Sequence, residues 1–198
     1  MWHKNGVTRP PSSSNRRQRA VRPLDEQGLN NLALRYVERF ATTRAKLAAY
    51  LDRKVRERGW EGSGHADTQG IAQRFAEQGY VDDAGYALAK SRSLAGRGYG
   101  KRRLSVALRV AGVEEADSAA AHALADEEAI TAAVRFAQRR RIGPFARSEP
   151  SSPAERDKAI GAMLRAGHDF GLARAIAAMP PIEDADADML AKELAGAQ

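Results

Sequence analysis

The sequence predicts an all-α protein made of three tandem three-helix repeats set in an extended row. Much of its 43% hydrophobic content is alanine, the residue with the highest helix propensity, and aromatic residues make up only 6%. Glycines that end a predicted helix recur at intervals of 53 and 55 residues, at Gly59, Gly112 and Gly167. A period of about 50 residues is typical of stacked helical modules.

Five segments follow from this period. They are a basic disordered arm over residues 1–28, repeats over 29–80, 81–125 and 126–180, and an acidic tail over 181–198. The predicted helices cover 29–40, 43–59, 67–79, 82–95, 100–111, 114–124, 126–141, 152–167 and 169–179. The arm mixes arginines with prolines and serines, a composition that cannot bury a core.

The first repeat shows the apolar period of a helix most clearly. Apolar side chains recur at i, i+3, i+4 and i+7 from Leu29 to Phe40 and define one face. A threonine at 42 or 43 is placed to cap the second helix, which Gly59 ends. An Asp-Thr pair at 67–68 opens the third helix.

The second repeat begins at a capped turn. Gly79 occupies the left-handed position just after a helix, Asp82 is the expected N-cap of the next one, and Asp83 adds a carboxylate to its positive end. That helix stops in the glycine-rich stretch 96–100, and a new helix starts at once at Lys101. Acidic residues from Glu114 open the third helix of this repeat.

The third repeat contains the clearest helix start. Ser152, Pro153 and Glu155 stand at the N-cap, first and third positions, the pattern of a capping box with proline at its preferred place. Asp126 is expected to open the preceding helix and Asp169 the following one. The acidic tail then predicts at most a short helix from residue 186, with Met189, Leu190 and Leu194 as a weak apolar stripe.

The start of the 100–111 helix conflicts with simple helix electrostatics. Lys101, Arg102 and Arg103 place three cations at the positive end of the dipole, which costs roughly 0.3–1 kcal/mol for each. Such an arrangement indicates a use outside the helix, in which cationic side chains and first-turn N–H groups together hold a polyanion. The alternative is an ordinary solvated face. Because the net charge is +7, an acidic partner such as nucleic acid or a nucleoprotein is favoured.

Several kinds of chemistry find no support in the sequence. There is no cysteine, so disulfides, thiol catalysis and cysteine zinc sites are excluded, and a reducing cytosol is the expected location. The four histidines lack metal-ligand spacing, and His168 beside Gly167 is interpreted as a partner of a helix C-terminus. The 96–102 stretch misses the phosphate-loop spacing, since Ala95 stands where a glycine is needed. We expect no enzyme activity, no cofactor, no metal and no membrane partner.

A helix-turn-helix DNA-binding transcriptional regulator is the alternative. The 103–124 segment reads as helix, glycine turn and helix. The second helix, however, begins with Glu114, Glu115 and Asp117, which would repel DNA where a recognition helix approaches it. This makes sequence-specific DNA binding the weaker hypothesis.

The chain resembles the RecX family of bacterial recombination regulators. The resemblance covers roughly residues 29–179 and leaves out both tails. It is carried by Leu34–Tyr36, Gly79–Asp83, Ala89–Arg92, Gly98–Leu104, Gly112–Val113, Arg139–Phe145 and Lys158–Gly167. It implies an elongated, curved repeat protein that binds the RecA–DNA filament and inhibits RecA strand exchange, ATP hydrolysis and co-protease activity. The longer second helix before Gly59 and the extended loop after it depart from the family pattern.

Ten cations are the candidate contacts to DNA phosphate or to acidic patches on such a filament. They are Arg35, Arg44, Lys46, Arg92, Lys101, Arg102, Arg103, Arg139, Arg140 and Arg141. The expected partners are the RecA filament and single- and double-stranded DNA, bound non-specifically and with salt dependence. The protein is expected to act as a monomer.

Overall fold

The computed structural model describes residues 22–196, and these residues form ten α-helices and one 3₁₀ turn. The helices are α1 (Glu26–Val37), α2 (Arg44–Arg58), α3 (Thr68–Glu77), α4 (Asp83–Gly96), α5 (Lys101–Ala111), α6 (Glu115–Glu127), α7 (Ala129–Arg140), α8 (Pro153–Ala166), α9 (Phe170–Ala178) and α10 (Ala187–Gly196), with η1 at Gly143–Phe145. Within this range, the pairing of Leu24 with Trp60 is the one isolated β-bridge. The all-helical prediction is confirmed.

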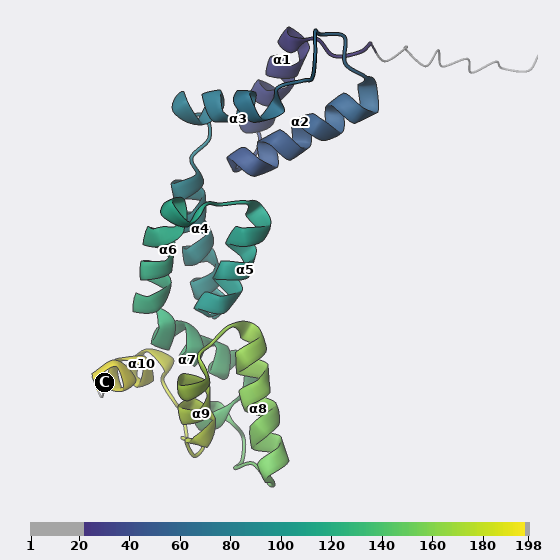
Figure 1. Ribbon diagram of the computed structural model, residues 1–198. Coiled ribbons are helices and arrows are strands. Elements are labelled where there is room, and N and C mark those ends of the chain that lie inside the picture. The colour runs from purple at the N-terminus through teal and green to yellow at the C-terminus, as the bar shows by residue number, and fades with distance from the viewer. Residues whose placement is uncertain (1–21, 197–198) are drawn as a thin grey trace, which may run out of the picture.

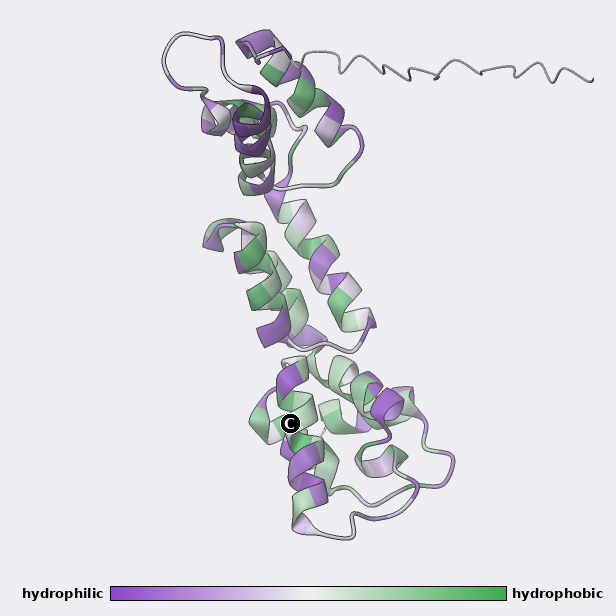
Figure 2. Ribbon diagram, turned by 90° about the vertical axis from the view of Figure 1, so that its right-hand side faces the viewer, coloured by the Kyte–Doolittle hydropathy of each residue, from purple (hydrophilic) through white to green (hydrophobic). Residues whose placement is uncertain are grey.

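The molecule is elongated, with its helices gathered into three groups along one long axis (Figure 1). Each group has its own hydrophobic cluster. The first is centred on Leu29, Leu47 and Ile71, the second on Leu104 and Leu108, and the third includes residues from α7 to α10. Green and purple segments alternate along the helices in Figure 2, as expected where each helix buries one face. The exact domain boundaries given above stay a prediction.

Alanine lets the helices of the second group approach closely. Ala87 of α4 and Ala121 of α6 are fully buried, and the Ser91 hydroxyl donates a 3.0 Å hydrogen bond to the Ala121 carbonyl between the two helices. Because a methyl side chain is small, the two helix backbones can approach closely, and the hydrogen bond gives the buried Ser91 hydroxyl a partner. The alanine-rich composition therefore becomes a set of tight helix contacts.

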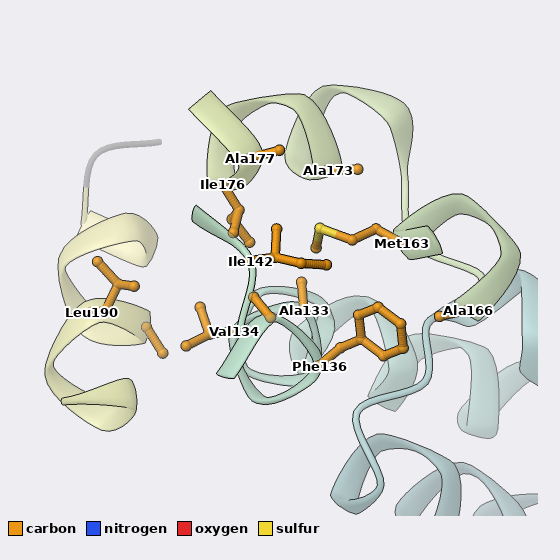
Figure 3. Packing of buried hydrophobic residues seen from close by; sticks show 12 residues of the cluster. Ala133, Val134, Phe136, Ile142, Met163, Ala166, Ala173, Ile176, Ala177 and Leu190 are labelled. Carbon is orange, nitrogen blue, oxygen red and sulfur yellow. The ribbon is translucent and has the colours of Figure 1, made fainter. Parts of the chain in front are cut away.

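The third cluster also includes the acidic tail. Leu190 and Ala191 of α10 are buried against α7, and Figure 3 shows Val134 turned toward Leu190 while Phe136 lies toward Ala166 of α8. Met189, expected on the same apolar stripe, is 71% exposed. The tail helix is thus part of the fold, held by fewer apolar residues than the pattern suggested.

Three other expectations about the elements need correction. Helix α1 begins at Glu26 and is capped by Asp25, and Leu24 before it is buried. Residues 22–28, predicted as part of the disordered arm, therefore belong to the folded part. Residues 1–21 of the predicted arm lie outside the described residues. Phe40 is not on the helix face: α1 ends at Val37, and the ring is 56% exposed in the following loop. Helix α6 continues to Glu127, which moves the start of α7 past the predicted Asp126.

Candidate nucleic-acid interface

The second helices of the three groups, α2, α5 and α8, meet end to end. At the first joint, the start of α2 lies against the end of α5, where the Thr43 hydroxyl donates a 2.6 Å hydrogen bond to the Ala111 carbonyl. Gly112 ends α5 with a left-handed φ of 68°, and a Cβ there would lie 2.3 Å from the Ala45 methyl group. Glycine is therefore required at this joint for both conformation and space.

At the second joint, the start of α5 lies against the end of α8. The N–H groups of Gly100 and Arg102 donate to the carbonyls of Ala166 and Gly167 at 3.0 and 3.2 Å. The positive end of one helix dipole thus faces the negative end of another. These first-turn N–H groups are occupied by protein and are not available to an anion, contrary to the expectation above.

This joint also explains the three cations at the start of α5. Cations are stabilised near the C-terminal carbonyls of a helix, and the end of α8 supplies those carbonyls. The electrostatic conflict seen in the sequence is offset by the end of α8, whose Gly167 carbonyl lies 65 residues after Arg102 in the chain (167 − 102). The cations are therefore not by themselves a sign of an external anion.

His168 closes the second joint. It is 2% exposed, and its Nε2 lies 3.1 Å from the Gly98 carbonyl oxygen, beside the ring of Phe136. Because a carbonyl only accepts, Nε2 carries the proton and donates it. Burial lowers the pKa of His168, and the hydrogen bond to Gly98 opposes this in part. The predicted role as a helix-end partner is thus replaced by a buried link between two groups.

Arg44 and Lys46 hold the first joint. The Arg44 guanidinium lies 3.2 Å from Asp83, 3.5 Å from Glu114 and 2.5 Å from Asp117. Partial burial favours a lower pKa for Arg44, but the hydrogen bond and charge of Asp83, with the charges of Glu114 and Asp117, raise it. Lys46 Nζ donates to the Tyr86 hydroxyl at 2.5 Å. Both cations are engaged within the protein.

The other predicted cations lie more openly. Lys101 forms a 2.6 Å ion pair with Asp126, and Arg102, 67% exposed, stays 4.0 Å from Asp169. The remaining exposed side chains lie on α1, on α4 and just after α7, and form no ion pair within 4.0 Å among residues 22–196. These are Arg35, Arg92 and Arg141.

Three of the predicted cations converge at one hollow, which we call the arginine groove. Its volume is about 490 Å³, and it is formed where the start of α5 meets the ends of α7 and α8. The lining residues are Tyr99, Arg103, Phe136, Arg139, Arg140, Ala162, Arg165 and Ala166. The lining combines apolar and aromatic side chains with four arginines.

The ring of Tyr99 lies close to three arginines in or beside the groove. The guanidinium carbons of Arg97, Arg103 and Arg139 lie 5.3, 5.4 and 5.9 Å from the centre of its ring. A tyrosine ring attracts cations through its negative face, which helps to hold like charges close together. Arg97 and Arg165 were not among the predicted contacts. The sequence gives only a weak indication of their role: Arg97 lies in a glycine-rich turn, and Arg165 lies in the last turn of α8.

The arginine groove contains no carboxylate. None of the lining residues is acidic, and across residues 22–196 neither the four lining arginines nor Arg97 forms an ion pair within 4.0 Å. Five neighbouring cations repel one another unless an anion joins them. Guanidinium groups match phosphate oxygens in geometry and charge, so the groove is suited to hold phosphate groups.

The part of the chain that the structure describes contains no group of three or more His, Cys, Asp or Glu side chains able to hold a metal ion. None of its helices is long and apolar enough to cross a membrane.

Comparisons with known proteins identify close relatives. No family model matches the sequence. The chain is 30% identical over 178 residues to the regulatory protein RecX of Myxococcus xanthus. The matched region covers 84% of this chain and 93% of the relative. It is 31% identical over 160 residues to the regulatory protein RecX of Agrobacterium fabrum, with 79% and 85% covered.

Solved structures show the same fold. The crystal structure of RecX from Lactobacillus salivarius superposes with a TM-score of 0.55 at 18% identity, covering 76% of this chain and 92% of that one. A second crystal structure, of a regulatory protein RecX, gives a TM-score of 0.55 at 17% identity over 76% and 70% of the two chains. At these identities the likeness concerns the fold alone.

Proposed function

The chain belongs to the RecX family of regulatory proteins, and from this premise we propose that it binds the RecA–DNA nucleoprotein filament. Binding would inhibit RecA strand exchange, ATP hydrolysis and co-protease activity, and so modulate recombination and the SOS response. The role is regulatory rather than catalytic. The site of action would be the cytoplasm, with the protein acting as a monomer.

One observation carries the proposal: the arginine groove is lined by four arginines and no carboxylate, and a fifth arginine, Arg97, lies beside it at Tyr99. Phosphate contacts of this kind position a protein on nucleic acid without reading its sequence, and they weaken as salt rises. A filament that contains DNA offers regularly spaced phosphates, and the elongated molecule offers a long surface to match (Figure 1). Non-specific binding to single- and double-stranded DNA is part of the same proposal.

The proposed contacts fall into two classes. Arg103, Arg139 and Arg140 are the main contacts, joined by Arg97 and Arg165 in or beside the groove. The exposed cations outside it are secondary contacts to phosphate or to acidic protein surface; they are Arg35, Arg92, Lys101, Arg102 and Arg141. Arg44 and Lys46 act mainly by holding the first joint.

A sequence-specific transcriptional regulator fits the geometry less well. Helix α6 would have to enter the major groove, but it packs along α4 and its Asp117 is paired with Arg44. The carboxylates of Glu114 and Glu115 would face phosphate. We therefore keep filament binding as the proposed function.

The test is RecA ATP hydrolysis on single-stranded DNA with increasing amounts of this protein. Wild type should inhibit, and Arg139→Gln/Arg140→Gln/Arg165→Gln should need at least about tenfold more protein, since each lost charged contact costs roughly 0.5–1 kcal/mol. The control Arg56→Gln/Arg147→Gln/Arg174→Gln removes the same charge from exposed positions outside the groove. Absence of inhibition by wild type contradicts the proposed function; equal effects of the two triple variants contradict the role of the groove.

A further inference from the structure

Two large aromatic side chains stand exposed on neighbouring turns of the first group. Phe40, in the loop after α1, is 56% exposed, and Tyr80, in the turn before α4, is 54% exposed. Each is supported by a second ring: Tyr36 lies 5.2 Å from Phe40, and Phe75 lies 5.5 Å from Tyr80, measured between ring centres. The two rings are thus held in place by packing while more than half of each stays open.

Both rings line the same hollow, which we call the aromatic groove. Its volume is about 450 Å³, and Phe40, Thr42, Tyr80, Tyr86, Ala89 and Lys90 are among its lining residues. That volume is within the range of about 300–1,000 Å³ typical of small-molecule sites. Thr42 is 6% exposed, and its buried hydroxyl has no hydrogen-bond partner among residues 22–196.

The charges around the aromatic groove favour an anionic ligand. Lys90 lines it, and Lys46 lies 4.5 Å from the centre of the Tyr86 ring. The one lining carboxylate, Asp82, accepts a 2.8 Å hydrogen bond from the Gly85 N–H as the cap of α4. Lys90 is the lining cation, since Lys46 is held by Tyr86. Exposed aromatic side chains next to a positive charge are the combination that binds single-stranded nucleic acid.

We propose that the aromatic groove is a nucleobase site, where bases of single-stranded DNA stack on Phe40 and Tyr80 and Lys90 holds an adjacent phosphate. The arginine groove is less suited to stacking, because three guanidinium groups already lie within 5.9 Å of the centre of its Tyr99 ring. The two grooves therefore divide the work: one holds phosphates, the other holds bases. The inference rests on the proposed function, from which it takes DNA as the polymer.

The test compares two oligonucleotides of equal length, oligothymidylate and an abasic deoxyribose-phosphate chain, in fluorescence anisotropy titrations. Phe40→Ala/Tyr80→Ala should weaken binding of oligothymidylate by about 5-fold or more, the range for losing one stacked base, and leave the abasic chain unaffected. Arg139→Gln/Arg140→Gln should weaken the binding of both oligonucleotides. Phe170→Ala is the matched control, since Phe170 is 53% exposed but lies outside the groove.

Three outcomes would overturn the inference. They are unchanged affinity of the double alanine variant for oligothymidylate, an equal loss for both ligands, and loss of RecA-filament binding with oligonucleotide binding intact, which would assign the groove to a protein partner. Phe40→Leu/Tyr80→Leu keeps apolar packing and removes the rings, so it replaces the alanine variant if that one unfolds. Base-dependent binding without RecA inhibition would leave this inference standing and remove only the proposed function.

Discussion

The carboxylate of Asp83 accepts two hydrogen bonds from Arg44, one from its backbone N–H at 2.9 Å and one from its Nε at 3.2 Å. This single contact joins the start of α2 to the start of α4, across 39 residues of sequence. The Asp83 side chain is 4% exposed, so the pair is desolvated on the acidic side. Together with the contacts of Arg44 to Asp117 and of Thr43 to Ala111, it links the first group to the second.

Asp83→Ala should lower the free energy of unfolding by about 3 kcal/mol. The substitution removes the buried partner of Arg44, which keeps only the more exposed Glu114 and Asp117, and it leaves a helix N–H unsatisfied. Chemical denaturation monitored by circular dichroism gives the change. Asp157→Ala, at an exposed position on α8, is the control and should stay within about 0.5 kcal/mol of wild type. Equal stability of the two variants would show that the joint does not depend on this pair.

The arginine groove should set the salt dependence of DNA binding. Each phosphate contact on a single strand contributes about 0.7 to the slope of log K against log salt. Arg139→Gln/Arg140→Gln/Arg165→Gln should therefore reduce the magnitude of that slope by about 2. Titrations of oligothymidylate at several salt concentrations measure it. Lys46→Gln, by contrast, should leave the slope nearly unchanged, because Lys46 is bound to Tyr86.

Gly100 and Gly96 form a matched pair for testing the second joint. A Cβ at Gly100 would lie 2.3 Å from the Gly167 carbonyl oxygen, whereas one at Gly96 meets nothing within 4 Å. Gly100→Ala should destabilise the protein by about 2 kcal/mol, because the two helix ends must move apart. Gly96→Ala should be neutral or stabilising by up to about 1 kcal/mol, since alanine favours the helix. Thermal unfolding of both variants measures these changes in stability. An unchanged stability of Gly100→Ala would mean that the two helix ends are not closely packed at this joint.

Stability should fall as the pH drops below about 6.5, because of His168. Its pKa is lowered from the ordinary 6.5 by burial, so between the two values the unfolded chain binds a proton that the folded protein does not. The contribution is complete above 6.5 and is lost as the pH falls through the lower, folded pKa. Melting temperatures measured between pH 7.5 and 5 should show this fall. His168→Asn should flatten that part of the curve; an unchanged profile would assign the effect to other groups.

Local signals in the sequence predicted local structure well. The Ser152 cap, with its 3.4 Å hydrogen bond from the Glu155 N–H, and the left-handed Gly112 and Gly167 depend on residues a few positions apart. Long-range partners were not visible. Arg44 carried the sequence pattern of a surface cation, and only the fold brings Asp83 and Asp117 to it.

The same limit applies to the candidate interface. Arg103 and Arg139 were predicted as separate contacts, but nothing in their spacing shows that both lie over Tyr99. The acidic tail shows the same limit. The sequence predicted its short helix and a weak apolar stripe that includes Leu190, but it did not show that Leu190 attaches α10 to α7. Both results depend on packing between elements far apart in the chain.

The joints between α2, α5 and α8 follow one design, in which the end of each later helix receives the start of the earlier one. Thr43 caps α2 from its own chain and at the same time contacts the end of α5, whereas Ser152 caps α8 with no helix of the described residues behind it. The start of α8 therefore lies at one end of the row, and the two joints determine how far α2 lies from it.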